Sequence, residues 1–247
     1  MKKIALFLTA VSLAAGSAFA ALEGTDNASN YGGTWINGSN GGTPGTFNPW
    51  DLTNNGGGGF EGYFLGSSTD GSGNINTGGV SFGIFANPAG AFADALRSFG
   101  STLSVGQTFS IDIAVNFRNG NKGFSLFDGA TEIFNLNVGG DDYQINGLSI
   151  GAPYSSTAIF SLSLTQTSLT AGSYSVFYNG NSQTYTGGFT GLASGFKLYN
   201  SGTDNGDAAN NLYFNNLAIV PEPSSLTLLA GPALLGAWFF VRRRRSA

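Results

Sequence analysis

Between residues 80 and 220, apolar side chains recur at every second position in short runs that Gly and Asn separate. The longest run comprises Phe109, Ile111, Ile113, Val115 and Phe117. Successive side chains of a β-strand point to opposite faces, so this spacing predicts strands with one buried face. The next turn pair, Asn119-Gly120, accepts the positive φ of a tight hairpin. The alternation therefore restricts this part of the chain to an all-β fold.

Further strands are predicted around Phe82, Phe124, Phe134, Tyr143, Phe160, Tyr174, Phe196 and Leu212. Residues 89–99 break the alternation and predict a short helix or turn. The apolar phase changes at Asn215-Asn216, which predicts a β-bulge in the last strand. Strands about every 8–15 residues, without a fixed sequence repeat, favour an antiparallel sandwich or barrel over a propeller.

Among sandwiches we expect a jelly roll. Residues 106–120 and 211–219 resemble strands of concanavalin-like lectin and glucanase domains. We assign the sandwich core to residues 80–220. Residues 21–79 are rich in Gly, Asn, Ser and Thr but also carry scattered aromatic residues, whose burial would order them. This segment is expected to supply outer strands and loops, with short strands near residues 31–36 and 59–65.

The first 20 residues have the order of a secretory signal peptide. Lys2 and Lys3 precede an apolar stretch, and Ala18 and Ala20 form a small-x-small cleavage site. A mature chain would then begin at Ala21 after cleavage by signal peptidase. The alternative is an N-terminal membrane helix, but the stretch is short and ends in the cleavage pattern.

The C-terminal residues 221–245 combine three elements. Pro221, Glu222 and Pro223 form a stiff, extended segment, because proline fixes φ and biases its predecessor toward extended backbone. Residues 224–241 contain no charge and are long enough to cross a bilayer, which takes about 20 apolar residues as a helix. The chain then ends with a basic block that would stay on the cytoplasmic side: Arg242, Arg243, Arg244 and Arg245.

This order of a Pro-Glu-Pro motif, a membrane span and a basic end resembles the PEP-CTERM sorting signal of Gram-negative bacteria. The resemblance covers about the last tenth of the chain. It implies recognition by exosortase, a membrane transpeptidase-like enzyme, and association with the cell surface and exopolysaccharide. The alternative is a plain single-span anchor with a proline-containing linker.

Charge limits the partners of the predicted exported part. Residues 21–220 contain four basic and 13 acidic side chains, so their net charge is near −9. Such a surface repels nucleic acid and anionic lipid. Arg118 and Lys122 flank a predicted turn, where they are expected to pair with acids across the hairpin.

The sequence offers little for catalysis. It contains no histidine or cysteine, which excludes a Ser-His-Asp triad, a Cys-His pair and a His-ligated zinc ion. Glycosidases need two carboxylates at a controlled separation, and the acid pair Asp141-Asp142 is the candidate left for a hydrolase. We therefore expect no enzymatic activity and no required cofactor.

Two oxygen-rich loops are candidate calcium sites. One contains Asp141 and Asp142, and the other contains Asp204 and Asp207. Calcium prefers six to eight oxygen ligands, but neither loop has EF-hand spacing. The alternative is that these residues are there because Asp and Asn favour turns.

Carbohydrate binding would use aromatic and amide side chains at a loop end or on a concave face. The aromatic candidates are Trp35, Trp50, Tyr143, Tyr154, Tyr178, Tyr185 and Tyr199. Each of them could instead be a core residue. The sequence thus predicts an exported, surface-sorted, non-enzymatic protein of the cell surface or polysaccharide matrix. The alternative is a lectin-like carbohydrate-binding module, with or without assistance from calcium.

Overall fold

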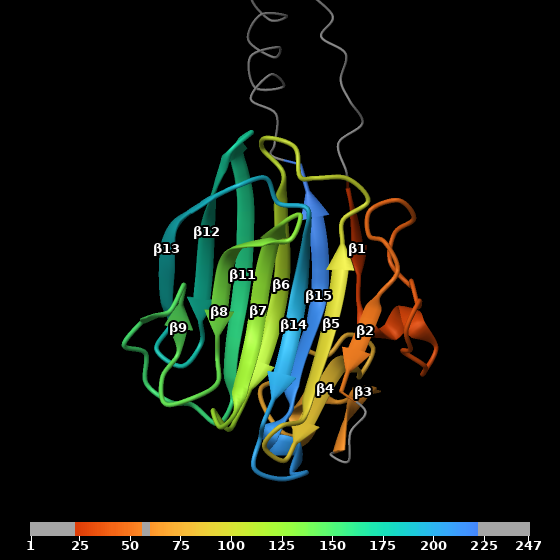
Figure 1. Ribbon diagram of the computed structural model, residues 1–247, viewed down its shortest axis with the longest axis vertical. Helices are drawn as coiled ribbons and strands as arrows, with labels where there is room; N and C mark the ends of the chain where they lie inside the picture. Colours follow the sequence, from red (N-terminus) through yellow and green to blue (C-terminus); the bar gives the residue numbers. More distant parts are fainter. Residues whose placement is uncertain (1–22, 56–59, 222–247) are drawn as a thin grey trace, which may run out of the picture.

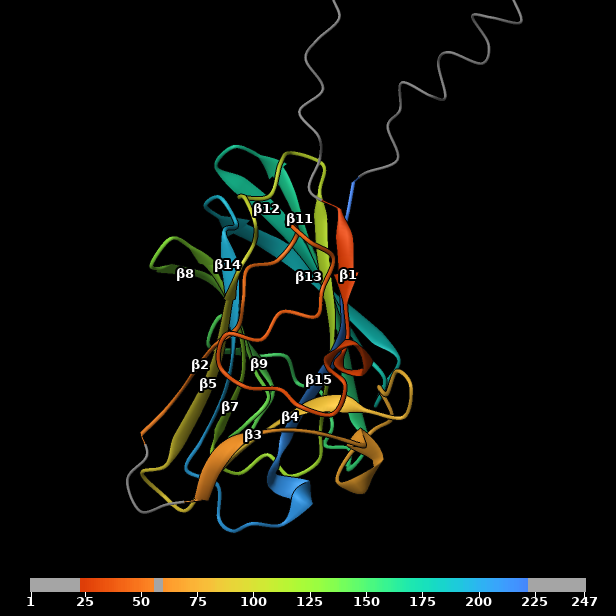
Figure 2. The ribbon, with the colours of Figure 1, turned by 90° about the vertical axis from the view of Figure 1, so that its right-hand side faces the viewer.

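The computed structural model describes residues 23–55 and 60–221, and these form two antiparallel sheets that pack face to face (Figures 1 and 2). The order of strands in the 8-stranded sheet is β13 (Gln183–Thr190), β12 (Ala171–Tyr178), β11 (Ala158–Ser168), β6 (Thr108–Val115), β15 (Leu212–Val220), β4 (Ser81–Asn87) and β3 (Phe60–Gly66), with β1 (Gly24–Asp26) paired to β15. The order in the 7-stranded sheet is β10 (Leu148–Ser149), β9 (Gln144–Ile145), β8 (Thr131–Asn137), β7 (Asn121–Asp128), β14 (Gly195–Ser201), β5 (Phe92–Ser98) and β2 (Asp51–Asn54).

The chain passes repeatedly from one sheet to the other, which gives a jelly-roll-like sandwich. It crosses between β4 and β5, between β6 and β7, and again from β13 through β14 to β15. The described helical elements are the short 3-10 turns η1 (Ala28–Tyr31), η2 (Ser68–Asp70) and η3 (Ala208–Asn210). The prediction of an antiparallel β-sandwich is confirmed.

The predicted alternation produces the core between the sheets. In β6, Phe109, Ile111 and Ile113 are buried, and the side chains between them are partly exposed. The ring of Phe109 stacks on Phe196 of β14 in the opposite sheet, with ring centroids 4.9 Å apart. Such contacts between the inner faces hold the two layers together.

The segment before β2 closes one side of this core. Trp35, Phe47 and Trp50 are buried, although none of them lies inside a strand. The prediction of a strand at residues 31–36 is wrong, because Gly32 and Gly33 follow η1 with positive φ values of 59° and 90°, which break an extended backbone. The strand predicted at residues 59–65 is confirmed as β3.

The prediction of a helix or turn at residues 89–99 is also wrong, because β5 occupies most of this range. Its inward side chains are Ala93, Ala95 and Arg97, and its outward side chains include Asp94 and Leu96. Two alanines and a charged residue conceal the apolar alternation in the sequence. The charge of Arg97 is tolerated in the core because it pairs with buried Asp26.

The predicted bulge at Asn215-Asn216 is confirmed. The register between β15 and β6 shifts between Asn215 and Ala218, and Asn216 has a φ of 57°. The buried Asn215 side chain accepts a hydrogen bond from the Ala28 amide and donates to the carbonyls of Ile75 and Val80. The bulge therefore anchors two loops to the last strand.

The two ends of the described chain lie together. β1 pairs with β15, so that Gly24 lies opposite Ile219, and both neighbouring chain ends leave from the same end of the sandwich (Figure 1). No helix among the described residues has the length and apolar character needed to cross a bilayer. The predicted signal peptide (1–20) and membrane span (224–241) lie outside the described residues.

Candidate functional site

Two rows of side chains cross the outer face of the 7-stranded sheet. Strand register places the first row side by side in the order Asn135, Ser125, Lys197, Leu96 and Asp51. The second row runs through Gln144, Asn137, Gly123, Tyr199, Asp94 and Thr53. Both rows extend from β8 to β2, and the second row also includes β9.

These rows line two adjoining depressions of about 610 and 590 Å³. Lys197 lines both depressions, so they adjoin at this residue, and we call the two together the sheet groove. Its first part lies over β7, β8 and β9, and its second part lies over β2 and β5.

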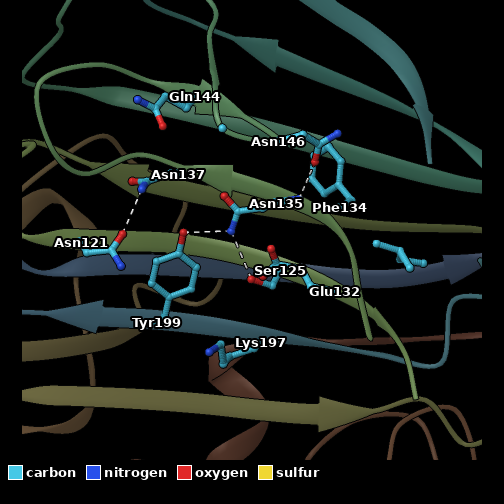
Figure 3. Close-up of a pocket in the computed structure, with 12 residues that line it drawn as sticks. Asn121, Ser125, Glu132, Phe134, Asn135, Asn137, Gln144, Asn146, Lys197 and Tyr199 are labelled. Carbon is cyan, nitrogen blue, oxygen red and sulfur yellow. Dashed lines mark hydrogen bonds between the residues drawn. The ribbon is translucent and has the colours of Figure 1, made fainter. Parts of the chain in front are cut away.

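The first part of the groove is lined mainly by amides (Figure 3). Asn135 Nδ2 donates to the hydroxyl of Tyr199 at 3.0 Å and to Ser125 Oγ at 3.2 Å. Asn137 Nδ2 donates to Asn121 Oδ1 at 2.9 Å. These contacts fix the orientation of each amide, so their remaining donors and acceptors point to defined positions in the groove.

Tyr199 lies across the floor of the groove because Gly123 opposes it on β7. A Cβ atom added to Gly123 would lie 2.7 Å from the Tyr199 hydroxyl oxygen and 2.0 Å from the Leu136 carbonyl oxygen. Burial raises the pKa of Tyr199 to about 12, and the hydrogen bond from Asn135 opposes this shift. Tyr199 is therefore a protonated phenol at neutral pH.

A partly exposed ion pair lies where the two parts of the groove meet. Lys197 Nζ is 3.3 Å from Asp94 Oδ2, and it also lies 5.5 Å from the ring centroid of Tyr199. The other carboxylates lining the groove are Glu132 and Asp51, which are both exposed. The groove thus combines neutral amides with an excess of acids over bases.

The two predicted calcium loops partly converge on a third depression of about 640 Å³, beyond the strand ends opposite the described chain ends. Asp141 and Asp204 line it together with Arg118, but Asp142 and Asp207 do not. Asp207 Oδ1 instead accepts a hydrogen bond from the Ala209 amide and caps η3. No three acidic side chains gather into a metal-binding group within residues 23–55 and 60–221, and calcium binding stays a prediction.

Arg118 and Lys122 do not pair with acids across the hairpin as predicted. The Arg118 guanidinium lies over the rings of Tyr143 and Tyr154, 5.0 and 5.7 Å from their centroids. Lys122 points into the core, where Nζ donates to the carbonyls of Phe117 and Asn210 at 2.8 Å. The ion pairs in the described part of the chain are instead Arg97–Asp26 and Lys197–Asp94.

The predicted aromatic candidates separate into core and surface residues. Trp35, Trp50, Tyr143 and Tyr178 are buried in the core. Tyr154 is exposed beside Arg118, and Tyr185 is partly buried at the edge strand β13. Tyr199 is the one candidate from this set that lines the sheet groove.

Sequence reasoning missed the groove amides Asn121, Asn135, Asn137, Gln144 and Asn146. The signal for two of them was present in the alternation, because Asn135 and Asn137 occupy the positions between inward Phe134, Leu136 and Val138. An alternating strand predicts its outward residues as well as its inward ones. Which strands lie beside each other cannot be read from that pattern.

The sorting residues lie at or beyond the end of the described chain. Pro221 directly follows β15. The other predicted sorting and cleavage residues lie outside the described residues: Glu222, Pro223, Arg242, Arg243, Arg244, Arg245, Ala18 and Ala20.

No protein-family model matches the chain, and no curated protein sequence matches it. Among solved structures, it is similar to alginate lyase AlgAT5 from Polysaccharide Lyase family 7, with 13% identity and a TM-score of 0.38 over 60% of this chain and 81% of the lyase. It is also similar to the metal-free form of lectin I-B4 from Griffonia simplicifolia, with 8% identity and a TM-score of 0.36 over 68% of this chain and 92% of the lectin. Nothing about the activity, ligand or metal content of this chain follows from similarity at this level.

Proposed function

We propose that this chain is an exported, non-enzymatic protein whose sandwich binds polysaccharide in the sheet groove. The observation that carries the proposal is the group of amides next to Tyr199, of which Asn121, Asn135 and Asn137 are oriented by side-chain hydrogen bonds. Sugar hydroxyls both donate and accept hydrogen bonds, and Asn and Gln side chains offer both functions. A rigid sheet also holds such groups in place better than loops do.

The carboxylates of the groove support binding without hydrolysis. The Asp94 carboxylate already pairs with Lys197 Nζ at 3.3 Å. Glu132 on β8 lies three strand spacings from Asp94 on β5, so their lateral separation alone is roughly 14 Å at about 4.8 Å per strand. Glycosidase carboxylates are about 5–9.5 Å apart, so these two residues do not match that geometry.

Asp51 and Asp94 lie on neighbouring strands, so this pair of acids tests whether the groove hydrolyses polysaccharide. We expect no new reducing ends or unsaturated products when the protein is incubated with a panel of polysaccharides. Activity that is lost in both Asp51→Asn and Asp94→Asn would identify an enzyme instead.

Binding is tested with substitutions in the groove that leave the fold intact. Gln144 lines the groove and has no side-chain hydrogen bond to any described residue. Gln144→Ala should weaken polysaccharide binding about fivefold, the equivalent of one net hydrogen bond of about 1 kcal/mol. The matched control is Asn74→Ala, which removes an exposed amide outside the groove and should leave binding unchanged. Equal binding by both variants would exclude the groove as the site.

The sequence also supports surface sorting as the route by which the domain is delivered. Signal peptidase would release Ala21, the C-terminal span would hold the chain in the inner membrane, and exosortase would act at Pro221, Glu222 and Pro223. The protein would then reach the cell surface or extracellular matrix. Calcium at Asp141 or Asp204 would be an accessory to this role.

Mass spectrometry of the mature C-terminus tests the sorting proposal. In a host with exosortase, the wild-type protein should lose Arg242 to Arg245. Alanine at positions 221–223 should leave the full-length form in the membrane fraction. Identical fractionation of the two proteins would favour a plain anchor.

A further inference from the structure

The charges of the sheet groove define the class of polysaccharide that it accepts. We infer that the groove binds uncharged polysaccharide, along the interior of a chain, and rejects polyuronates. This inference rests on the proposed function, because it specifies the ligand of the same groove.

The groove has no cation available for an anionic ligand. Two basic residues line it. Lys197 already pairs with Asp94, and Arg97, which lines the second depression, has a buried side chain that pairs with Asp26. Glu132 and Asp51 add two exposed carboxylates on either side of this pair. A polyuronate lying in the groove would therefore meet unpaired negative charges and no free positive charge.

Among the described residues, the basic side chains other than Lys197 cannot supply a free positive charge to the groove. Arg97 and Lys122 point into the core, and each of them already has hydrogen-bond partners there. Arg118 lines the third depression, at one end of the sandwich, and lies over Tyr143 and Tyr154. Recognition of a carboxylate normally uses Arg or Lys as a charge-assisted donor. The groove instead presents Asn, Gln, Ser and Tyr groups, which match neutral hydroxyls.

The shape of the groove indicates binding along the interior of a chain. The two depressions adjoin at Lys197, and the second side-chain row crosses six strands from β9 to β2. Six strands span roughly 24 Å at about 4.8 Å per spacing, which is much longer than one sugar ring. Affinity should therefore rise with oligosaccharide length, and a free chain end should not be required.

The experiment compares neutral and acidic polysaccharides. Native affinity electrophoresis is run with β-1,3-glucan, hydroxyethyl cellulose, xylan, mannan, galactan and dextran, and with alginate and polygalacturonate. We expect retardation by at least one neutral polymer and by neither polyuronate. For the neutral polymer that binds, the dissociation constant should change less than about twofold between 20 and 500 mM salt, because no ion pair with the ligand is involved. Its hexasaccharide should bind at least about tenfold more tightly than its disaccharide.

Two substitutions test the negative charge of the groove without altering the fold. Glu132→Gln and Asp51→Asn replace exposed carboxylates with amides of the same shape, so the sandwich should remain intact. The double variant should keep its neutral ligand and gain affinity for polyuronate at low salt.

Each outcome bears on a different proposal. Binding of a polyuronate by the wild-type protein, with loss in Gln144→Ala, would overturn the selectivity but leave polysaccharide binding in place. Equal affinity for the disaccharide and hexasaccharide would overturn binding along the chain interior. Failure to bind any polymer, with the fold confirmed by circular dichroism, would overturn both the proposed function and this inference.

Discussion

Asp26 and Arg97 depend on each other inside the core. Both side chains are fully buried, and Arg97 also donates from Nε to the Asn48 carbonyl at 2.7 Å. Its guanidinium lies 4.7 Å from the ring centroid of Trp50. A buried charge is tolerated only when it is paired and hydrogen-bonded. This ion pair therefore determines whether the N-terminal segment that contains Asp26 can remain packed against the core.

Removing one partner tests that dependence. Asp26→Ala should lower the free energy of unfolding by about 3–5 kcal/mol, because Arg97 would remain buried without its counter-ion. Urea denaturation followed by circular dichroism measures the change. Asp94→Asn, which breaks the partly exposed pair with Lys197, should cost less than about 1 kcal/mol. Similar losses of unfolding free energy in the two variants would contradict the difference expected between the buried and the partly exposed ion pair.

Lys122 makes stability depend on pH. Burial lowers its pKa to about 7, and the charge of Asp204 opposes this shift. The unfolded lysine keeps a pKa of about 10.4, so the unfolded chain binds more protons between these values. The free energy of unfolding should therefore rise with pH above about 7, by up to about 1.4 kcal/mol per pH unit.

The measurement is a series of urea titrations from pH 6 to 9.5, below the range in which the buried tyrosines ionise. Lys122→Met keeps the apolar side-chain length and removes the titrating group, so its stability should rise less steeply with pH. The same slope in both proteins would show that another group is responsible.

At the scale of the strands, the groove depends on a close approach between β7 and β14. Gly123 faces Tyr199 across this pair, and the missing Cβ leaves room for the phenol. A larger residue would displace the ring and the Asn135 amide that is bonded to it. One glycine therefore shapes the floor of the groove.

Gly123→Ala should cost about 1–3 kcal/mol of stability through overpacking and should weaken polysaccharide binding. The matched control is Gly188→Ala on edge strand β13, where the nearest atom to an added Cβ is 3.4 Å away. Thermal unfolding and affinity electrophoresis report the two effects. A Gly123→Ala protein with unchanged stability and binding would show that Tyr199 does not need this space.

At the scale of the whole molecule, the first and last described strands close the sandwich together. β1 pairs with β15, and the loops that follow β1 deliver Trp35, Phe47 and Trp50 to the core. Both ends of the described chain leave side by side, so a C-terminal anchor would leave the opposite end of the sandwich farthest from a membrane.

Removal of the first segment tests this arrangement. A chain that begins at residue 51 would lose Asp26 and these three aromatic residues, leaving Arg97 unpaired and the core open. It should show no cooperative unfolding transition in circular dichroism or calorimetry. A chain that begins at residue 23 keeps all described contacts and should unfold like the full chain.

The alternation of Phe109, Ile111 and Ile113, with Gly and Asn at the turns, determined by itself that this chain is an all-β sandwich, because the two-residue period is a local property of strands. The phase change at Asn215-Asn216 located the bulge in the same way. Strand β5 was not predicted because its inward side chains are Ala93, Ala95 and Arg97, which do not form a recognisable apolar alternation. Arg97 can be buried only because Asp26, 71 positions away, pairs with it. The groove likewise depended on tertiary structure: Asn137, Gly123, Tyr199 and Asp94 come from four strands, and only the long-range pairing of those strands places them in one row.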